Sequence, residues 1–202
     1  MGMKRFYQAA LRVALAFALS GCGSISDLLR PSTHDEIAGY TPTPEKAVVI
    51  FFRSSPYKYE VQSSVFEVEG ERNRLVGIVS SGAKIAYETA PGRKLFMVIG
   101  ENADFMEADL EAGRTYYVYV APREGRWKAR FSLKPLSRHN PKTRDPEKWG
   151  IETCMFYENT PAAFEWAEKN MQSIRQKQAD YYKKWLETPA DKRPMLHRDD
   201  AE

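Results

Sequence analysis

Between Lys46 and about Leu136 the chain consists of short β-branched and aromatic runs, separated by Gly or Pro turns every eight to twelve residues. This spacing is typical of an all-β sandwich or barrel, because each run is long enough for one strand and each turn lets the chain reverse. We expect a mainly β domain over residues 46–136 with strands at Ala47–Arg53, Ser63–Glu69, Arg74–Ser80, Lys84–Thr89, Lys94–Gly100, Phe105–Leu110, Thr115–Ala121 and Arg126–Leu133.

Two of these runs differ from the others in being apolar throughout. Val48–Phe52 and Leu95–Ile99 contain no polar residue, so each predicts a central strand or one covered on both faces. The last run alternates instead, and its period of two predicts that Trp127, Ala129, Phe131 and Leu133 face the core.

Three segments of this domain resemble a known kind of module. They are Ala47–Arg53, Ala90–Arg93 and Leu110–Val120, which includes a glycine followed by paired aromatics at Gly113–Tyr117. The chain here resembles an uncharacterised domain of proteobacterial lipoproteins that is similar to PEGA-type and carboxypeptidase-regulatory β-sandwiches. The resemblance covers residues 46–136. It implies an Ig-like or transthyretin-like sandwich of seven or eight strands and carries over no catalytic residue.

A long helix is expected after an irregular loop at 137–159, in which a short strand fits Thr153–Tyr157. Thr160 suits the N-cap and Pro161 the first helical position, and Pro189 ends the helix, which gives the bounds 160–188. An apolar stripe follows at helical spacing, and its largest members are Phe164, Met171, Ile174, Tyr181 and Trp185. This stripe packs on its own sheet, on another copy of the chain, or on a partner protein. The last residues, 189–202, are charged and are expected to be disordered.

The first residues have the pattern of a secretory signal. Lys4 and Arg5 precede an apolar run at Val13–Leu19 that is too short to span a bilayer. Leu19-Ser20-Gly21-Cys22 resembles the lipobox of bacterial lipoproteins, which implies cleavage after residue 21 and acylation of Cys22. Acyl chains on Cys22 would hold the protein on a membrane surface, since each buried methylene contributes about 0.8 kcal/mol.

The segment 22–45 follows the predicted lipid anchor and is rich in Ser, Thr and Pro. This composition predicts a flexible tether, and its residues 24–45 could stretch to roughly 75 Å at about 3.4 Å per residue. Gly23 follows the cysteine where an Asp would favour retention at the inner membrane. By that resemblance we expect an outer-membrane lipoprotein on the periplasmic face.

Charge argues against one class of partner and suggests another. The formal net charge is +3, and Lys4, Arg5 and Arg12 of the predicted signal account for all of it, so binding to nucleic acid is not expected. Residues 114–148, however, carry ten basic side chains against three acidic ones. Such asymmetry can orient a protein near anionic groups. The candidate surface for an anionic glycan or lipid is Arg126, Lys128, Arg130 and Lys134.

The sequence offers little catalytic chemistry. A glycine-rich phosphate loop, a zinc-binding histidine pair and a nucleophile elbow are all missing from it. His34, His139 and His197 fall in the predicted tether, loop and tail, so we expect no metal or acid–base site from them. Cys154 is read as a small buried residue rather than a catalytic thiol.

Two further groups of side chains have both a structural and a functional interpretation. Glu67, Glu69 and Glu71 lie at period two, and a solvated outer face is favoured over a cation site. Tyr117 and Tyr119 fit the core better than a sugar-stacking platform.

Two functions from different classes remain. The first is a non-catalytic lipoprotein, anchored through Cys22, whose sandwich is an interaction or structural module for a protein partner in the envelope. The second is an envelope protein that binds glycan or anionic lipid through its basic strand and loop. Neither requires a cofactor or a metal, and an enzyme is not expected.

Overall fold

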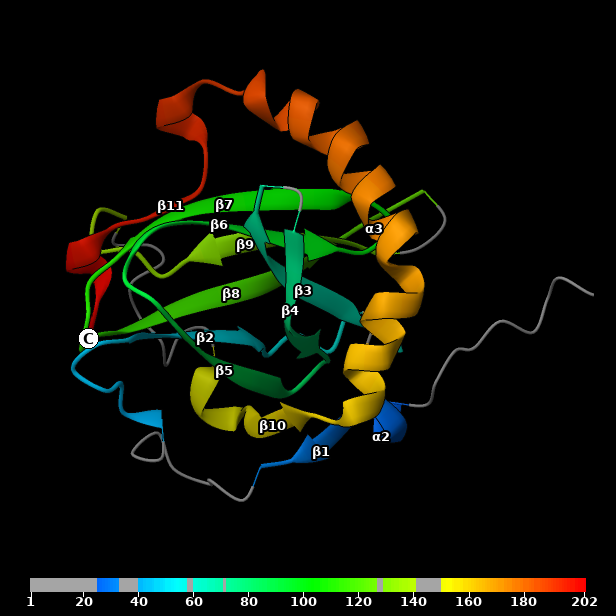
Figure 1. The fold of residues 1–202 in the computed structure, drawn as a ribbon, viewed down its shortest axis with the longest axis horizontal. Helices are drawn as coiled ribbons and strands as arrows, with labels where there is room; N and C mark the ends of the chain where they lie inside the picture. The colour runs from blue at the N-terminus through cyan, green and yellow to red at the C-terminus, as the bar shows by residue number, and fades with distance from the viewer. Residues whose placement is uncertain (1–24, 33–39, 58–59, 71, 127–128, 141–149) are drawn as a thin grey trace, which may run out of the picture.

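Two mixed β-sheets pack face to face in the computed structural model, which describes residues 25–32, 40–57, 60–70, 72–126, 129–140 and 150–202. Figure 1 shows the sheets with one long helix beside them. The six-stranded sheet has the order β1 (Leu29–Pro31), β10 (Met155–Asn159), β5 (Ala83–Thr89), β2 (Ala47–Arg53), β8 (Thr115–Arg123), β9 (Arg130–Pro135). The five-stranded sheet has the order β11 (Met195–Leu196), β7 (Ala103–Leu110), β6 (Gly92–Ile99), β3 (Ser63–Glu69), β4 (Arg72–Val79).

This arrangement confirms the predicted β-sandwich followed by a C-terminal helix. The eight predicted strands correspond to β2 through β9, and the bounds of β2 and β3 agree to the residue. The last predicted strand begins later than expected, at Arg130, and Trp127 and Lys128 lie outside the described residues. The short strand expected at Thr153–Tyr157 is also present, as β10, shifted by two residues, whereas the short strands β1 and β11 were not predicted.

Strand β2 is buried on both faces, as its continuous apolar run predicts. Val49 and Phe51 belong to the core between the sheets, where the ring of Phe51 meets that of Phe96 at 5.2 Å between centroids. Val48, Ile50 and Phe52 face the other way and join a second cluster with Leu136, Ile151 and Phe156. The segment after β9 therefore covers the outer face of the six-stranded sheet.

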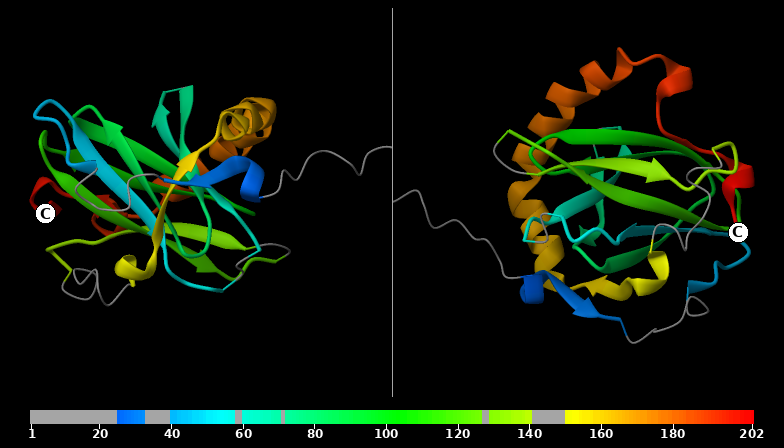
Figure 2. Two further views of the ribbon diagram at one scale, coloured as in Figure 1. Left: turned by 90° about the horizontal axis from the view of Figure 1, so that it is seen from below. Right: turned by 180° about the vertical axis from the view of Figure 1, so that it is seen from behind.

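The helix α3 (Pro161–Leu186) lies along the five-stranded sheet, at the outer edge of the molecule in both views of Figure 2. Phe105 of β7 packs against the rings of Tyr182 and Trp185, at 5.1 and 5.8 Å between centroids. The predicted position of Thr160 at the N-cap is confirmed, but its hydroxyl donates to the carbonyl of Asp27 instead of capping the helix. This bond joins the start of α3 to the short helix α2 (Ile25–Leu28).

The described part of the predicted tether is packed, which corrects the expectation of a free linker over 22–45. Leu28 and Leu29 are each only 4% exposed, and β1 pairs antiparallel with β10. The ring of Tyr40 contacts that of Phe156 at a tilt, with 4.6 Å between ring centroids. These apolar side chains fix the segment because they reach buried positions that its overall Ser/Thr/Pro composition does not reveal.

The predicted disordered tail at 189–202 is also wrong. Strand β11 pairs parallel with β7, and Leu196 and Ala201 are fully buried. The amide of Glu202 donates to the carbonyl of Thr115 at 2.9 Å. Short strands of this kind cover sheet edges: β11 lies on the outer edge of β7, while β10 and β1 extend the sheet beyond β5.

Candidate functional site

The predicted basic surface is neutralised at its centre. Nε and Nη2 of Arg130 both donate to Oε1 of Glu101, at 3.1 and 3.0 Å, and the backbone amide of Arg126 reaches the same oxygen at 3.0 Å. Lys134 is exposed, and Lys128 lies outside the described residues. Glu101, in the turn before β7, thus pairs with the basic strand, which reduces the positive charge at the centre of the candidate surface.

The helix stripe is mostly buried against its own sheet. Ile174 is 3% and Trp185 is 8% exposed, while Met171 and Tyr181 are partly buried against the same core. Phe164 is the exception, with 49% of its surface exposed. Of the three packing partners expected for this stripe, the structure shows the chain's own sheet.

Two tyrosines considered for sugar stacking are core residues. Tyr117 and Tyr119 are 6% and 8% exposed and lie in the cluster on the outer face of the six-stranded sheet. Burial raises the pKa of both phenols. This confirms the core interpretation.

The expectation of a solvated acidic face is wrong for Glu67, whereas Glu69 is exposed as expected and Glu71 lies outside the described residues. The side chain of Glu67 is fully buried, and Lys94 reaches its Oε1 at 2.6 Å. The hydroxyls of Tyr87 and Thr89 donate to its Oε2 at 2.5 and 3.1 Å. Burial alone would raise the pKa of Glu67, but these hydrogen bonds and the Lys94 charge lower it below its ordinary value. The group is enclosed between the sheets and its two oxygens are engaged by Lys94, Tyr87 and Thr89, so we assign it a structural role.

Cys154 is buried, as its sequence context predicts, and is the free cysteine of the described residues. Burial raises the pKa of its thiol to about 11. A thiol with that pKa holds almost no thiolate at neutral pH, so it is a poor nucleophile. Nearby, Lys84 lies 4.4 Å above the ring of Phe156, and burial lowers the pKa of its ammonium group.

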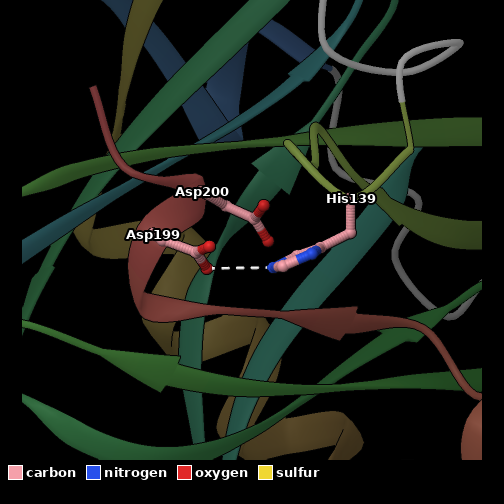
Figure 3. Close-up of side chains that lie close together, drawn as sticks. All are labelled: His139, Asp199 and Asp200. Atoms are coloured by element: carbon pink, nitrogen blue, oxygen red, sulfur yellow. Dashed lines mark hydrogen bonds and ion pairs between the residues drawn. The ribbon is translucent and has the colours of Figure 1, made fainter.

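A cluster of His139, Asp199 and Asp200 is the arrangement that the sequence did not reveal. One ligand atom from each of the three residues lies within 4.8 Å of the other two. His139 comes from the turn after β9 and the two aspartates from the last turn of the chain, about 60 residues later. Figure 3 shows the imidazole and both carboxyl groups pointing toward one another.

Nε2 of His139 lies 3.0 Å from Oδ1 of Asp199. This hydrogen bond lowers the pKa of the Asp199 carboxyl. The ring of His197 meets the ring of His139 edge-on, at 4.7 Å between centroids. Of these four side chains, those of His197, Asp199 and Asp200 come from the tail, for which the composition predicted disorder. The sequence therefore offered no reason to expect them beside His139.

Asp200 holds this cluster in place. It is only 5% exposed, and its Oδ1 accepts hydrogen bonds from the Ser137 hydroxyl at 2.9 Å and from the Arg138 amide at 2.5 Å. Its Oδ2 accepts from the His197 amide at 2.7 Å. One carboxylate therefore ties the tail to the turn after β9.

An open pocket of about 570 Å³ adjoins the cluster. Its walls come from the end of β9 and from the tail, and they include Lys134, Asn140, Lys192, Met195 and His197. His197 lines this pocket and also contacts His139, so the cluster and the pocket share a wall.

Comparison with known proteins adds no assignment: no protein-family model matches the chain, and no curated protein matches it. Among the described residues, no helix has the length and apolar character to cross a membrane.

Proposed function

We propose that this chain is a non-catalytic lipoprotein of the bacterial outer membrane. Acylated Cys22 anchors it on the periplasmic face, and the sandwich is an interaction or structural module for another envelope component. The lipobox-like residues 19–22 and the charged, then apolar, residues before them motivate the anchor.

The observation that supports the proposal best is how close Cys22 lies in the sequence to the first described element. Helix α2 starts at Ile25, and Leu28 and Leu29 are buried against the body. Only Gly23 and Ser24 separate Cys22 from α2. Cleavage before Cys22 would therefore leave every described element in place, as expected if the residues before it serve export and the residues after it form the mature protein.

The short distance along the chain from Cys22 to α2 would hold the sandwich closer to the membrane than a long tether would. Three residues of extended chain span about 10 Å, so an anchor at Cys22 would hold α2 close to the headgroups. The start of α3 lies beside α2, since the amide of Thr160 donates to the carbonyl of Leu28 at 3.0 Å. Phe164 in the first turn of α3 is about half exposed and would lie on the membrane-facing side.

The packing of α3 excludes its apolar stripe as the surface that binds a partner protein. The stripe is occupied by the five-stranded sheet, so a partner would bind elsewhere. The open pocket between the end of β9 and the tail is the surface that we propose for such contacts.

The alternative, binding of glycan or anionic lipid through Arg126, Lys128, Arg130 and Lys134, is weaker. Glu101 already engages Arg130, and Asp104 lies 3.3 Å from Nη2 of Arg123. Pairing of these two cations with carboxylates weakens their attraction for an anionic ligand.

Growth with labelled palmitate, followed by membrane fractionation, tests the proposal. The full chain should incorporate label and sediment with outer-membrane vesicles. The Cys22→Ser variant should incorporate none and should remain as an unprocessed precursor. A Cys154→Ser variant is the matched control, and it should be labelled like the parent protein. Equal labelling of the Cys22→Ser variant would refute the anchor.

A further inference from the structure

We propose that His139, Asp199 and Asp200 form a binding site for one divalent transition-metal ion of the Zn²⁺ type. The ion would join the turn after β9 to the C-terminal tail. This inference is independent of the anchor, because it concerns only described residues of the turn after β9 and of the tail.

The donor atoms are already close together. The three ligand atoms lie within 4.8 Å of one another, and Nε2 of His139 is 3.0 Å from Oδ1 of Asp199. A Zn²⁺ ion bound at about 2.0–2.2 Å from imidazole nitrogen and carboxylate oxygen needs donors separated by little more than 3 Å. Small rotations of two exposed side chains, His139 and Asp199, would bring the set to that geometry.

Asp200 has the hydrogen bonds that a metal-binding carboxylate usually needs. The Ser137 hydroxyl, the Arg138 amide and the His197 amide fix its orientation without occupying all of its acceptor capacity. Within the described residues Oδ2 accepts one bond, so it retains a lone pair for a cation. Such outer partners orient the ligands of protein metal sites.

The charge and chemistry of the donors select the ion. Two carboxylates and a neutral imidazole carry a charge of about −2, which a divalent cation balances. Calcium prefers six to eight oxygen ligands, whereas one nitrogen and two oxygens suit zinc and its neighbours. Three protein ligands leave room for water or for a group from the adjoining pocket.

If the cluster binds no metal, His139 and Asp199 form only an exposed ion pair, and the Asp200 carboxylate only holds the tail against the turn after β9. His139 and Asp199 have 57% and 60% of their side chains exposed, and exposed pairs contribute little to stability. The two interpretations differ in one measurable property, the affinity for Zn²⁺.

The test is calorimetric titration of the full chain, purified in detergent without a histidine tag and freed of metal with a chelator, using Zn²⁺ alone. We expect one ion per chain. The variants His139→Ala and Asp199→Asn should each bind at least about tenfold more weakly. Both residues are exposed, so these variants should fold, and their circular dichroism should match that of the parent protein.

Glu187→Gln is the matched control, because it removes an exposed carboxylate just before the same tail, outside both the cluster and the pocket. It should bind Zn²⁺ like the parent protein. Failure of the parent protein to bind Zn²⁺ would overturn the proposal. So would affinities within twofold of the parent in both His139→Ala and Asp199→Asn, since the ion would then be held elsewhere.

Discussion

Nζ of Lys94 lies 2.6 Å from Oε1 of Glu67, in the space between the two sheets. Lys94 lies on β6 two residues before Phe96, which is the residue that pairs with Glu67 of β3, and Tyr87 and Thr89 reach the same carboxylate from the opposite sheet. The sandwich therefore contains a buried ion pair whose remaining acceptor sites are filled by hydroxyls. The pair and these hydroxyls link the two sheets by polar contacts.

Loss of Lys94 should strongly destabilise the fold. We expect Lys94→Met to lower the free energy of unfolding by about 3–5 kcal/mol, because it leaves the Glu67 carboxylate buried without its cation. The double variant Lys94→Met with Glu67→Gln should recover most of this loss, since it removes the charge and keeps an acceptor for Tyr87. Urea unfolding followed by circular dichroism measures both.

The Arg74–Glu69 pair supplies the control for this experiment. Its side chains are 62% and 42% exposed, so Arg74→Met should cost less than about 1 kcal/mol. Equal losses in Lys94→Met and Arg74→Met would show that the pair at Glu67 is not buried as described.

Stability should fall in acid because of Glu67. Its pKa in the folded protein lies below the ordinary value of 4.5, so the folded state holds the charged form more tightly than the unfolded chain does. The resulting stabilisation is present above pH 4.5 and is lost as the pH falls through the lower pKa of the folded state. The slope of unfolding free energy against pH in this range should be smaller for Glu67→Gln. An unchanged slope would assign the acid sensitivity to other groups.

The C-terminal tail should be part of the cooperative fold. We expect Asp200→Ala to lower the free energy of unfolding by about 2–4 kcal/mol, because three donors lose their acceptor, two of them on the turn after β9. Hydrogen exchange provides a second measurement, because the amide of Glu107 bonds to the carbonyl of Pro194 and should be protected in the parent protein. In Asp200→Ala that protection should drop, whereas Asp191→Ala should leave it unchanged.

The two ends of the helix stripe should respond differently to truncation. Trp185 is 8% exposed and packs on Phe105, so Trp185→Ala should cost about 3–5 kcal/mol. Phe164 is 49% exposed, and Phe164→Ala should cost less than about 1 kcal/mol. Thermal unfolding of both variants separates them, and a large loss in Phe164→Ala would mean that its side chain is buried in solution.

The sandwich could be predicted because its strands carry local signals. β2 and β3 have runs of the right length between turn residues, and the continuous apolar run of β2 indicated that both faces are covered. The helix was equally visible from Pro161, Pro189 and the stripe between them. In these elements the secondary structure of each residue is determined mainly by its neighbours along the chain.

The remaining elements depend on contacts between distant segments. Strand β11 has only two residues, and its order comes from pairing with β7. Glu67 occupies one position of an alternating acidic run, and only the lysine and hydroxyls from β5 and β6 make burial of that carboxylate tolerable. His139 and Asp199 meet because the tail packs against the sandwich. Since the composition of the tail predicted disorder, the cluster could not be predicted either.

Mass spectrometry of the mature protein, extracted from envelopes, tests the central claim most directly. If the chain is a lipoprotein whose body begins beside its anchor, the N-terminal peptide will begin at Cys22 and will carry the added mass of a diacylglyceryl group. A mature chain that keeps residues 1–21, or one that begins at Cys22 without lipid, would contradict the proposed anchoring.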